Sequence, residues 1–126
     1  MFIAGNQCTA NSGKYFDVLN PGTEEIIAQV PLGDKEDAKR AIDAAREAFD
    51  RGVWSSKTPS ERARTLLRVA DLLESESSDF AVLESRNQGK AIKLARDSDL
   101  PFAVDNLRFF AGAIRTLECT SAAEYV

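Results

Sequence analysis

The 126-residue chain carries 16 lysines and arginines against 20 aspartates and glutamates, which gives a formal net charge of -4. A protein that binds the nucleic-acid backbone presents a basic patch or stripe, so this balance argues against that class. Apolar residues make up 44% of the chain and charged residues 29%, as is ordinary for soluble globular proteins. The length fits one domain-sized unit with a buried core.

Cysteine usage and the opening residues predict a cytoplasmic protein. The two cysteines, Cys8 and Cys119, lie near opposite ends of the chain and do not make a disulfide framework, so a reducing compartment is expected. The first five residues lack the basic residues and the length of a signal peptide. No apolar run approaches the roughly 20 residues that a membrane-spanning helix needs.

The first 31 residues have strand character. Residues 2–4 form a short apolar run, residues 15–19 a second candidate strand, and residues 25–30 a third that ends at Pro31. Between the last two, Asn20-Pro21-Gly22 favours a turn, because proline presets one backbone dihedral and glycine accepts a positive φ. Two or three short strands make an edge or a ribbon, and not an independent sheet with two covered faces.

Residues 34–118 have the periodicity of helices. Asp34 is expected to cap the first helix, with Asp37 in the capping-box position, and Gly52 to stop it. Thr58, Pro59 and Glu61 are typical of the start of a second helix. The apolar face of the first helix comprises Ala38, Ala41, Ile42, Ala45, Ala48 and Phe49, and the expected buried stripe of the second comprises Ala63, Leu66, Leu67, Ala70 and Leu73.

Two further helices are expected. A serine-rich break at residues 75–78 precedes a short helix that ends at Gly89, and a last helix begins near Pro101 with Asp99 as its cap. The last helix has an apolar stripe at steps of three and four: Ala103, Leu107, Phe110, Ala111, Ile114 and Leu117. Residues 119–126 would begin a strand, with nothing after Tyr125 and Val126 to complete it.

The chemistry of a complete active site is absent from these residues. There is no histidine, which removes the commonest general base and metal ligand near neutral pH. Neither cysteine has a neighbour in sequence that would lower its pKa, so both are interpreted as structural. The seven glycines are never closer than eight positions apart, whereas a phosphate-binding loop needs clustered glycines.

Four segments, in this order and at these spacings, resemble the N-terminal region of the aldehyde dehydrogenase family. They are residues 18–31 with the Asn-Pro turn, the alanine-rich helix 38–49 followed by Trp54, residues 59–67 and the helix leading to Gly89-Lys90, and Leu107-Arg108-Phe109-Phe110-Ala111-Gly112. The resemblance covers residues 2–126. The strings Glu84-Ser85-Arg86-Asn87 and Arg108-Phe109-Phe110-Ala111-Gly112 look most like the betaine-aldehyde and aminobutyraldehyde branch.

The resemblance implies an α/β family fold of which this chain is an incomplete N-terminal segment, with the cofactor-binding sheet missing. Residues 1–31 would be short strands and turns, residues 34–118 three to four packed helices, and residues 119–126 the start of a truncated strand. In the family the catalytic cysteine, the general-base glutamate, the oxyanion-binding asparagine and the Rossmann-like domain lie beyond this region. Neither Cys8 nor Cys119 corresponds to the nucleophile, so no catalytic or cofactor-binding residue is carried over.

For the full-length enzyme the resemblance implies oxidation of an aldehyde to a carboxylic acid with NAD or NADP, in a homo-oligomer. This segment would pack on the cofactor domain of its own subunit or on other subunits, and would bind no cofactor itself. Nucleic acid and membranes are not expected as partners.

Two secondary sites follow from the resemblance by position. A monovalent cation, K+ or Na+, would lie between backbone carbonyls of Val18 and Leu19 and the side chain of Asn87. Several family members have an aspartate at the position of Asn87, so binding here would be weak, and Asn87 as a polar helix-end cap is an equal alternative. Ser98 and Phe102 correspond to residues that border the substrate tunnel, although Phe102 also fits an ordinary exposed side chain.

Three functional hypotheses remain. The first is a fragment of an NAD(P)-dependent aldehyde dehydrogenase that is inactive alone. The second is a non-catalytic interaction module that docks on full-length subunits through exposed apolar surface. The third, a helical domain of unrelated function, is disfavoured by the four ordered segments.

Overall fold

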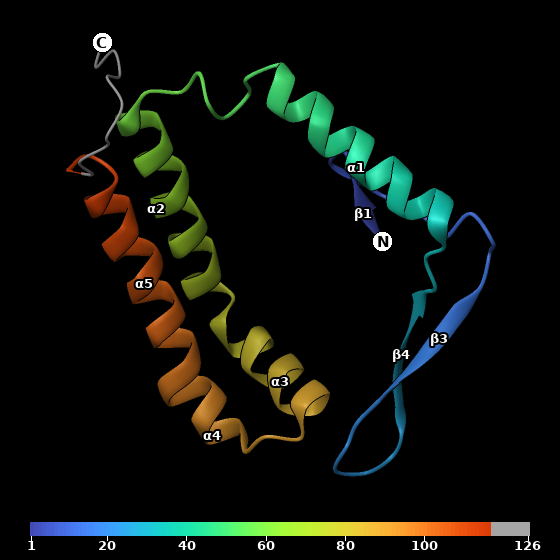
Figure 1. The fold of residues 1–126 in the computed structure, drawn as a ribbon. Coiled ribbons are helices and arrows are strands. Elements are labelled where there is room, and N and C mark those ends of the chain that lie inside the picture. The colour runs from blue at the N-terminus through green and yellow to red at the C-terminus, as the bar shows by residue number, and fades with distance from the viewer. Residues whose placement is uncertain (117–126) are drawn as a thin grey trace. The chain divides into compact units, whose positions relative to one another are not determined.

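The computed structural model describes residues 1–116 and divides into two compact units, Met1–Ser55 and Ser56–Val126. The first unit combines short strands with one helix, and the second consists of helices (Figure 1). Leu117 and the strand expected at residues 119–126 lie outside the described residues.

The strands of the first unit form two antiparallel hairpins. β1 (Phe2–Ile3) pairs with β2 (Asn6–Gln7), and β3 (Tyr15–Leu19) pairs with β4 (Ile26–Pro31). The predicted strands are confirmed, including the end of β4 at Pro31. Each pair is a separate two-stranded ribbon, as expected for strands this short.

The turn between β3 and β4 differs from expectation in one detail. The Asn20 side chain accepts a hydrogen bond from the Gly22 N–H at 2.9 Å, and the Asn20 carbonyl accepts one from the Glu24 N–H at 2.7 Å. The positive φ expected at Gly22 occurs instead at Glu24, where φ is 61°. The side chain of Asn20 holds the start of the turn, so the reversal of backbone direction is completed two residues later.

Helix α1 (Lys35–Asp50) begins where the sequence predicts, with Asp34 and Asp37 forming the capping box. Gly52 follows the helix with φ of 66°. The predicted apolar face, represented by Ile42 and Phe49, is largely exposed within this chain. The helix is therefore amphipathic, but the described residues leave its apolar face uncovered.

The Asp37 carboxylate joins this helix to a distant loop. Only 2% of Asp37 is exposed. Its two oxygens accept hydrogen bonds from the Asn11 N–H at 3.0 and 3.1 Å, and one of them also accepts from the Asp34 N–H at 3.0 Å. The Arg40 guanidinium donates to the same carboxylate. These donors lower the pKa of Asp37, chiefly through the Asp34 N–H, so the carboxylate stays charged and keeps its partners.

Helix α2 (Pro59–Ser75) opens the second unit with the predicted cap. The Glu61 carboxylate accepts from the Thr58 N–H at 2.8 Å and from the Thr58 hydroxyl at 2.9 Å, and these two bonds lower the pKa of Glu61. The Glu61 N–H in turn lies 3.3 Å from the Thr58 hydroxyl oxygen, which accepts its hydrogen bond. Ala63 and Ala70 are buried as expected, but Leu67 is 42% exposed and does not belong to the buried stripe. Leu67 lies at the flank of the helix, where periodicity alone does not decide which side is covered.

Helix α3 (Ser77–Gln88) follows α2 after the single residue Glu76, a shorter break than the serine-rich segment predicted. It ends at Gly89, whose φ of 68° is the left-handed conformation that glycine adopts readily at the end of a helix. The predicted end of this helix is confirmed.

Helical turns that the sequence did not predict precede the last predicted helix. α4 (Ile92–Leu94) continues through a π-helical turn, η1 (Ala95–Asp99), into α5 (Leu100–Ala113). Asp99 makes no capping hydrogen bond, because the helix already surrounds it. The start expected near Pro101 is confirmed by α5, which begins at Leu100, whereas the expected cap is wrong because η1 runs directly into α5.

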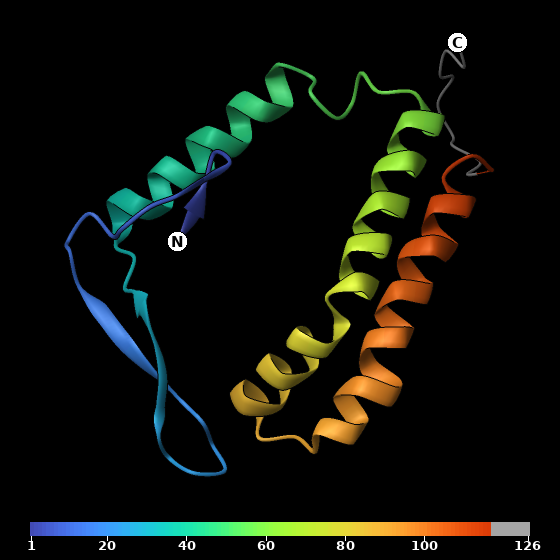
Figure 2. The same cartoon turned by 180° about the vertical axis from the view of Figure 1, so that it is seen from behind.

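The core of the second unit is built from small side chains. α2 and α5 lie side by side and antiparallel in both views (Figure 1 and Figure 2). Of the stripe predicted for α5, Ala111 is buried, whereas Phe110 is 58% exposed and Val104 takes a buried position instead. Among residues 56–116 of this unit, the buried residues are Ala63, Ala70, Ala81, Ala95, Val104 and Ala111.

Candidate functional site

The proposed cation ligands lie in two different units. Val18 and Leu19 are the last residues of β3, where the register between them and β4 shifts, and Val18 pairs with Ala28. Asn87 is the second-last residue of α3 and is exposed. The two units are described separately, so the convergence of these three residues stays a prediction.

Ser98 and Phe102, the expected tunnel residues, lie on one continuous helical segment. Ser98 is in the π-helical turn η1 and Phe102 is in the first turn of α5. Both are exposed, and Phe102 is 71% exposed. The wider π turn is closed by a hydrogen bond from the Leu100 N–H to the Ala95 carbonyl. π-helical turns often occur at functional sites, and this one contains Ser98 and ends three residues before Phe102.

Lys90 anchors this turn to the end of α3. Its ammonium group lies 2.5 Å from the Asp99 carboxylate and 3.3 Å from that of Glu84. The pair with Asp99, and to a lesser degree the bond to Glu84, raises the pKa of Lys90. Asp99 is thus an ion-pair partner and not a cap. No local signal links Lys90 to Asp99, since the two meet only after the chain folds back from α3.

A second ion-pair cluster joins α2 to α5. The Arg108 guanidinium lies 2.6 Å from the Glu74 carboxylate and 3.1 Å from that of Asp71. The hydrogen bonds raise the pKa of Arg108 and lower that of Glu74. The cluster is exposed to solvent, so it adds little to the free energy of unfolding. Its main effect is to favour one alignment of α2 along α5.

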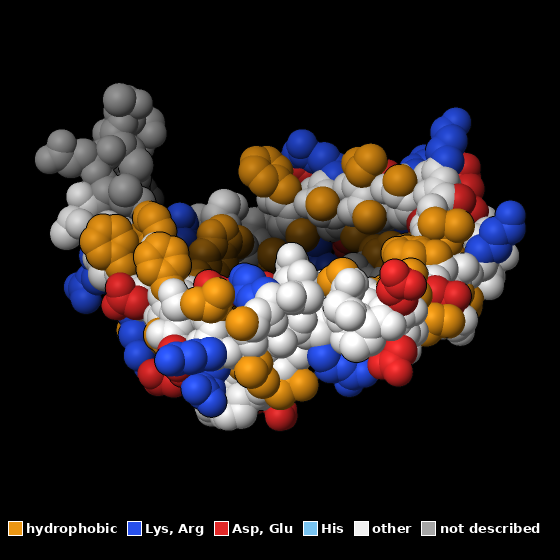
Figure 3. Space-filling view, turned by 90° about the horizontal axis from the view of Figure 1, so that it is seen from below, with side chains coloured by type: hydrophobic (Ala, Val, Ile, Leu, Met, Phe, Trp, Pro, Cys, Tyr) orange, Lys and Arg blue, Asp and Glu red, His pale blue; other side chains and the backbone are white. Residues whose placement is uncertain are grey.

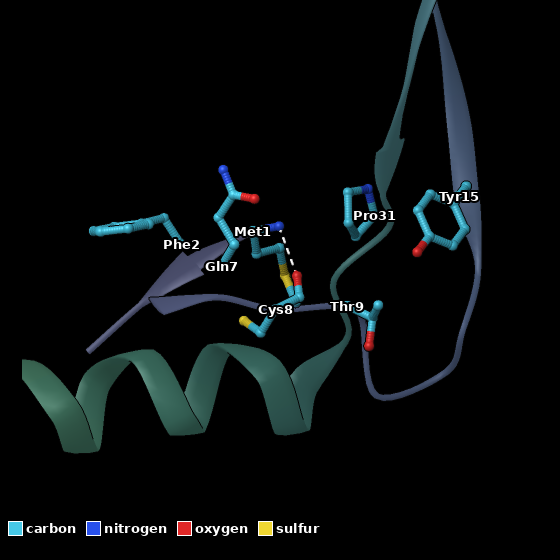
Figure 4. Close-up of a pocket in the computed structure, with 7 residues that line it drawn as sticks. All are labelled: Met1, Phe2, Gln7, Cys8, Thr9, Tyr15 and Pro31. Carbon is cyan, nitrogen blue, oxygen red and sulfur yellow. Dashed lines mark hydrogen bonds between the residues drawn. The ribbon is translucent and has the colours of Figure 1, made fainter. Parts of the chain in front are cut away.

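Two pockets, one in each unit, offer no catalytic constellation among the described residues. One pocket of about 480 Å³ is shown in Figure 4, where the N-terminal ammonium of Met1 donates to the Cys8 carbonyl at 2.9 Å. Its lining residues are Met1, Phe2, Gln7, Cys8, Thr9, Tyr15 and Pro31. The half-buried Cys8 thiol has no histidine to act as its base, because the sequence contains none.

A second pocket, of about 390 Å³, lies in the second unit between the end of α2 and the start of α5. Its arginines, Arg96 and Arg108, already pair with Asp97 and with Asp71 and Glu74. An anionic ligand would have to displace these carboxylates. Across residues 1–116, no cluster of three or more histidine, cysteine, aspartate or glutamate side chains is placed to hold a metal ion, and no helix is long and apolar enough to cross a membrane.

Comparison with known proteins decides the family. The sequence model of the aldehyde dehydrogenase family matches residues 8–124, which is most of the chain. The chain belongs to the aldehyde dehydrogenase family. The family expected from the four ordered segments is therefore confirmed.

The relatives that match this chain are several times longer than it is. The chain is 46% identical over 121 residues to 2-aminomuconic semialdehyde dehydrogenase of Bos taurus, covering 94% of this chain and 24% of that protein. It is 43% identical over 113 residues to aminoacetaldehyde dehydrogenase of Pseudomonas aeruginosa, covering 90% and 23%. The chain thus spans about a quarter of the length of these relatives.

A solved structure shows the same backbone arrangement. The indole-3-acetaldehyde dehydrogenase AldA of P. syringae, in complex with NAD+ and IAA, matches with a TM-score of 0.90 and 37% identity. The match covers 98% of this chain and 25% of that chain. The short strands and helices described above are therefore those of an aldehyde dehydrogenase N-terminal portion, as the sequence predicted.

Proposed function

We propose that this chain is the N-terminal segment of an NAD(P)-dependent aldehyde dehydrogenase, an enzyme that oxidises an aldehyde to a carboxylic acid, and that the segment carries none of the catalytic residues. The observation that carries the proposal is the family match over residues 8–124 in a chain that spans about a quarter of its relatives. The complex of the related AldA with NAD+ supports a nicotinamide cofactor for the whole enzyme.

The chemistry of the described residues supports an inactive segment. Oxidation of an aldehyde to an acid through a covalent intermediate needs an activated nucleophile, a base and a cofactor held against the substrate. Cys8 is the free thiol of the described part of the chain, and it lacks a neighbouring histidine. We therefore assign this segment a scaffolding role.

The exposed apolar surface supports a role that depends on further polypeptide. Hydrophobic side chains lie at the surface of the molecule (Figure 3). Phe102 and Phe109 on α5, and Ile42 and Phe49 on α1, are each about two-thirds exposed. Covering one such side chain contributes roughly 1.5–3 kcal/mol. The partner that we propose is the remainder of the same subunit. Other subunits of a homo-oligomer would bury exposed side chains that the same subunit leaves uncovered.

Reassembly with the missing portion tests this proposal. The purified chain, incubated with NAD or NADP and an aldehyde, is expected to form no reduced nicotinamide. When it is co-expressed with the related aminomuconic enzyme shortened by its matching N-terminal quarter, activity should return, because the segment completes the fold. The shortened enzyme alone is the control for residual activity.

A double variant, Cys8→Ser with Cys119→Ser, should leave the restored activity unchanged, since neither thiol is assigned to the reaction. Formation of reduced nicotinamide by the purified chain alone would contradict the proposal.

The second candidate function, an interaction module that docks on full-length subunits, is supported by the same exposed side chains. The experiment that separates the two adds the chain to an intact family enzyme. A module binds the intact enzyme and co-sediments with it, whereas a missing segment binds only the shortened enzyme, because in the intact subunit its place is filled.

We also propose a weak monovalent cation site formed by the backbone carbonyls of Val18 and Leu19 and the Asn87 side chain, since oxygen ligands suit hard cations. Potassium should raise the unfolding temperature of the reassembled enzyme relative to choline at equal ionic strength, because a ligand that binds only the folded state stabilises it. Asn87→Ala should abolish the difference and Asn87→Asp should enlarge it.

The neighbouring Gln88→Ala, which removes an exposed amide from the same helix end, is the matched control and should retain the potassium effect. If potassium still raises the unfolding temperature of Asn87→Ala, Asn87 is not a cation ligand and serves only as a polar residue at the end of α3.

Ser98 and Phe102 are proposed to border the substrate tunnel of the complete enzyme. Their exposure on the π-helical turn and the first turn of α5 leaves both side chains free to meet a substrate. In the reassembled enzyme, Phe102→Ala is expected to change the KM for bulky aldehydes by about tenfold and that for acetaldehyde far less, the scale of one apolar contact. Phe109→Ala serves as the control, because Phe109 lies on the same helix and is similarly exposed. Equal changes in KM for the two variants would contradict the proposal.

A further inference from the structure

We draw no further inference here: the strongest candidate, the exposed face of α5 where the rings of Phe109 and Phe110 meet edge to face beside Phe102, belongs to the surface already proposed to meet the rest of the enzyme, and nothing in the structure shows what else covers it.

Discussion

Replacing Ala70 by leucine is expected to destabilise the helical unit by roughly 1–3 kcal/mol, the usual cost of inserting extra carbon atoms into a close-packed core. Ala70 has no exposed surface, and α2 packs along α5 in this unit. The opposing helix also contributes a small buried residue, Ala111. Ala70 is completely covered by neighbouring atoms, so a longer side chain at this position has to displace them.

Thermal or denaturant unfolding of the reassembled enzyme measures this effect. Val69→Leu is the matched control, since it introduces the same side chain one residue away, at a position that is 45% exposed. Its free energy of unfolding should change by no more than about 0.5 kcal/mol, as for most surface substitutions. If Ala70→Leu and Val69→Leu unfold at the same temperature, the surroundings of Ala70 are not closely packed.

The second large effect is expected at Asp37. Asp37→Asn replaces one acceptor oxygen by an NH2 group that faces donors, the N–H groups of Asn11 and Asp34 and the Arg40 guanidinium. A buried donor that faces other donors loses its hydrogen bonds and keeps its desolvation cost. The loop at Asn11 should therefore detach from the start of α1, although the loop lies 26 residues away in sequence.

Hydrogen exchange at the Asn11 amide reports this tether directly. The amide should exchange about tenfold faster or more in Asp37→Asn, the scale of one lost hydrogen bond to a charged group. Asp43→Asn is the control, because Asp43 lies on the same helix, is exposed and pairs only with Lys39 among the described residues. Equal protection of the Asn11 amide in both variants would show that Asp37 does not hold the loop.

Acid should mimic the Asp37 substitution. The pKa of Asp37 is lowered in the folded chain, so its carboxylate adds stability that is complete above the ordinary aspartate pKa of about 3.9. That contribution is lost as the pH falls through the lower folded-state pKa. The Asn11 amide of the unsubstituted chain should therefore lose protection only in strong acid, and Asp37→Asn should lack this pH dependence.

Local signals in the sequence predict where most elements begin and end. The capping boxes at Asp34 with Asp37 and at Thr58 with Glu61 form as expected, because their partners are three residues apart and meet as soon as the first turn forms. The strand at residues 15–19 and the helix end at Gly89 are also predicted from local sequence, the helix end because glycine readily adopts the left-handed conformation. The proposed site residues rest on the family resemblance instead, because neither periodicity nor a local motif marks Asn87, Ser98 or Phe102 as functional.

Contacts between distant residues were decided by the tertiary structure alone. Periodicity identifies an apolar face but not its edges, so the exposure of Leu67 and Phe110 and the burial of Val104 depend on how α2 and α5 lie against each other. The pairing of Lys90 with Asp99 arises where α3 meets the π-helical turn. The sequence by itself thus determined the family, the strands and the helix caps at Asp34 and Thr58. The two caps could be predicted because they depend on interactions between residues close together in the chain. Packing determined which side chains are buried, because burial depends on elements far apart in the chain.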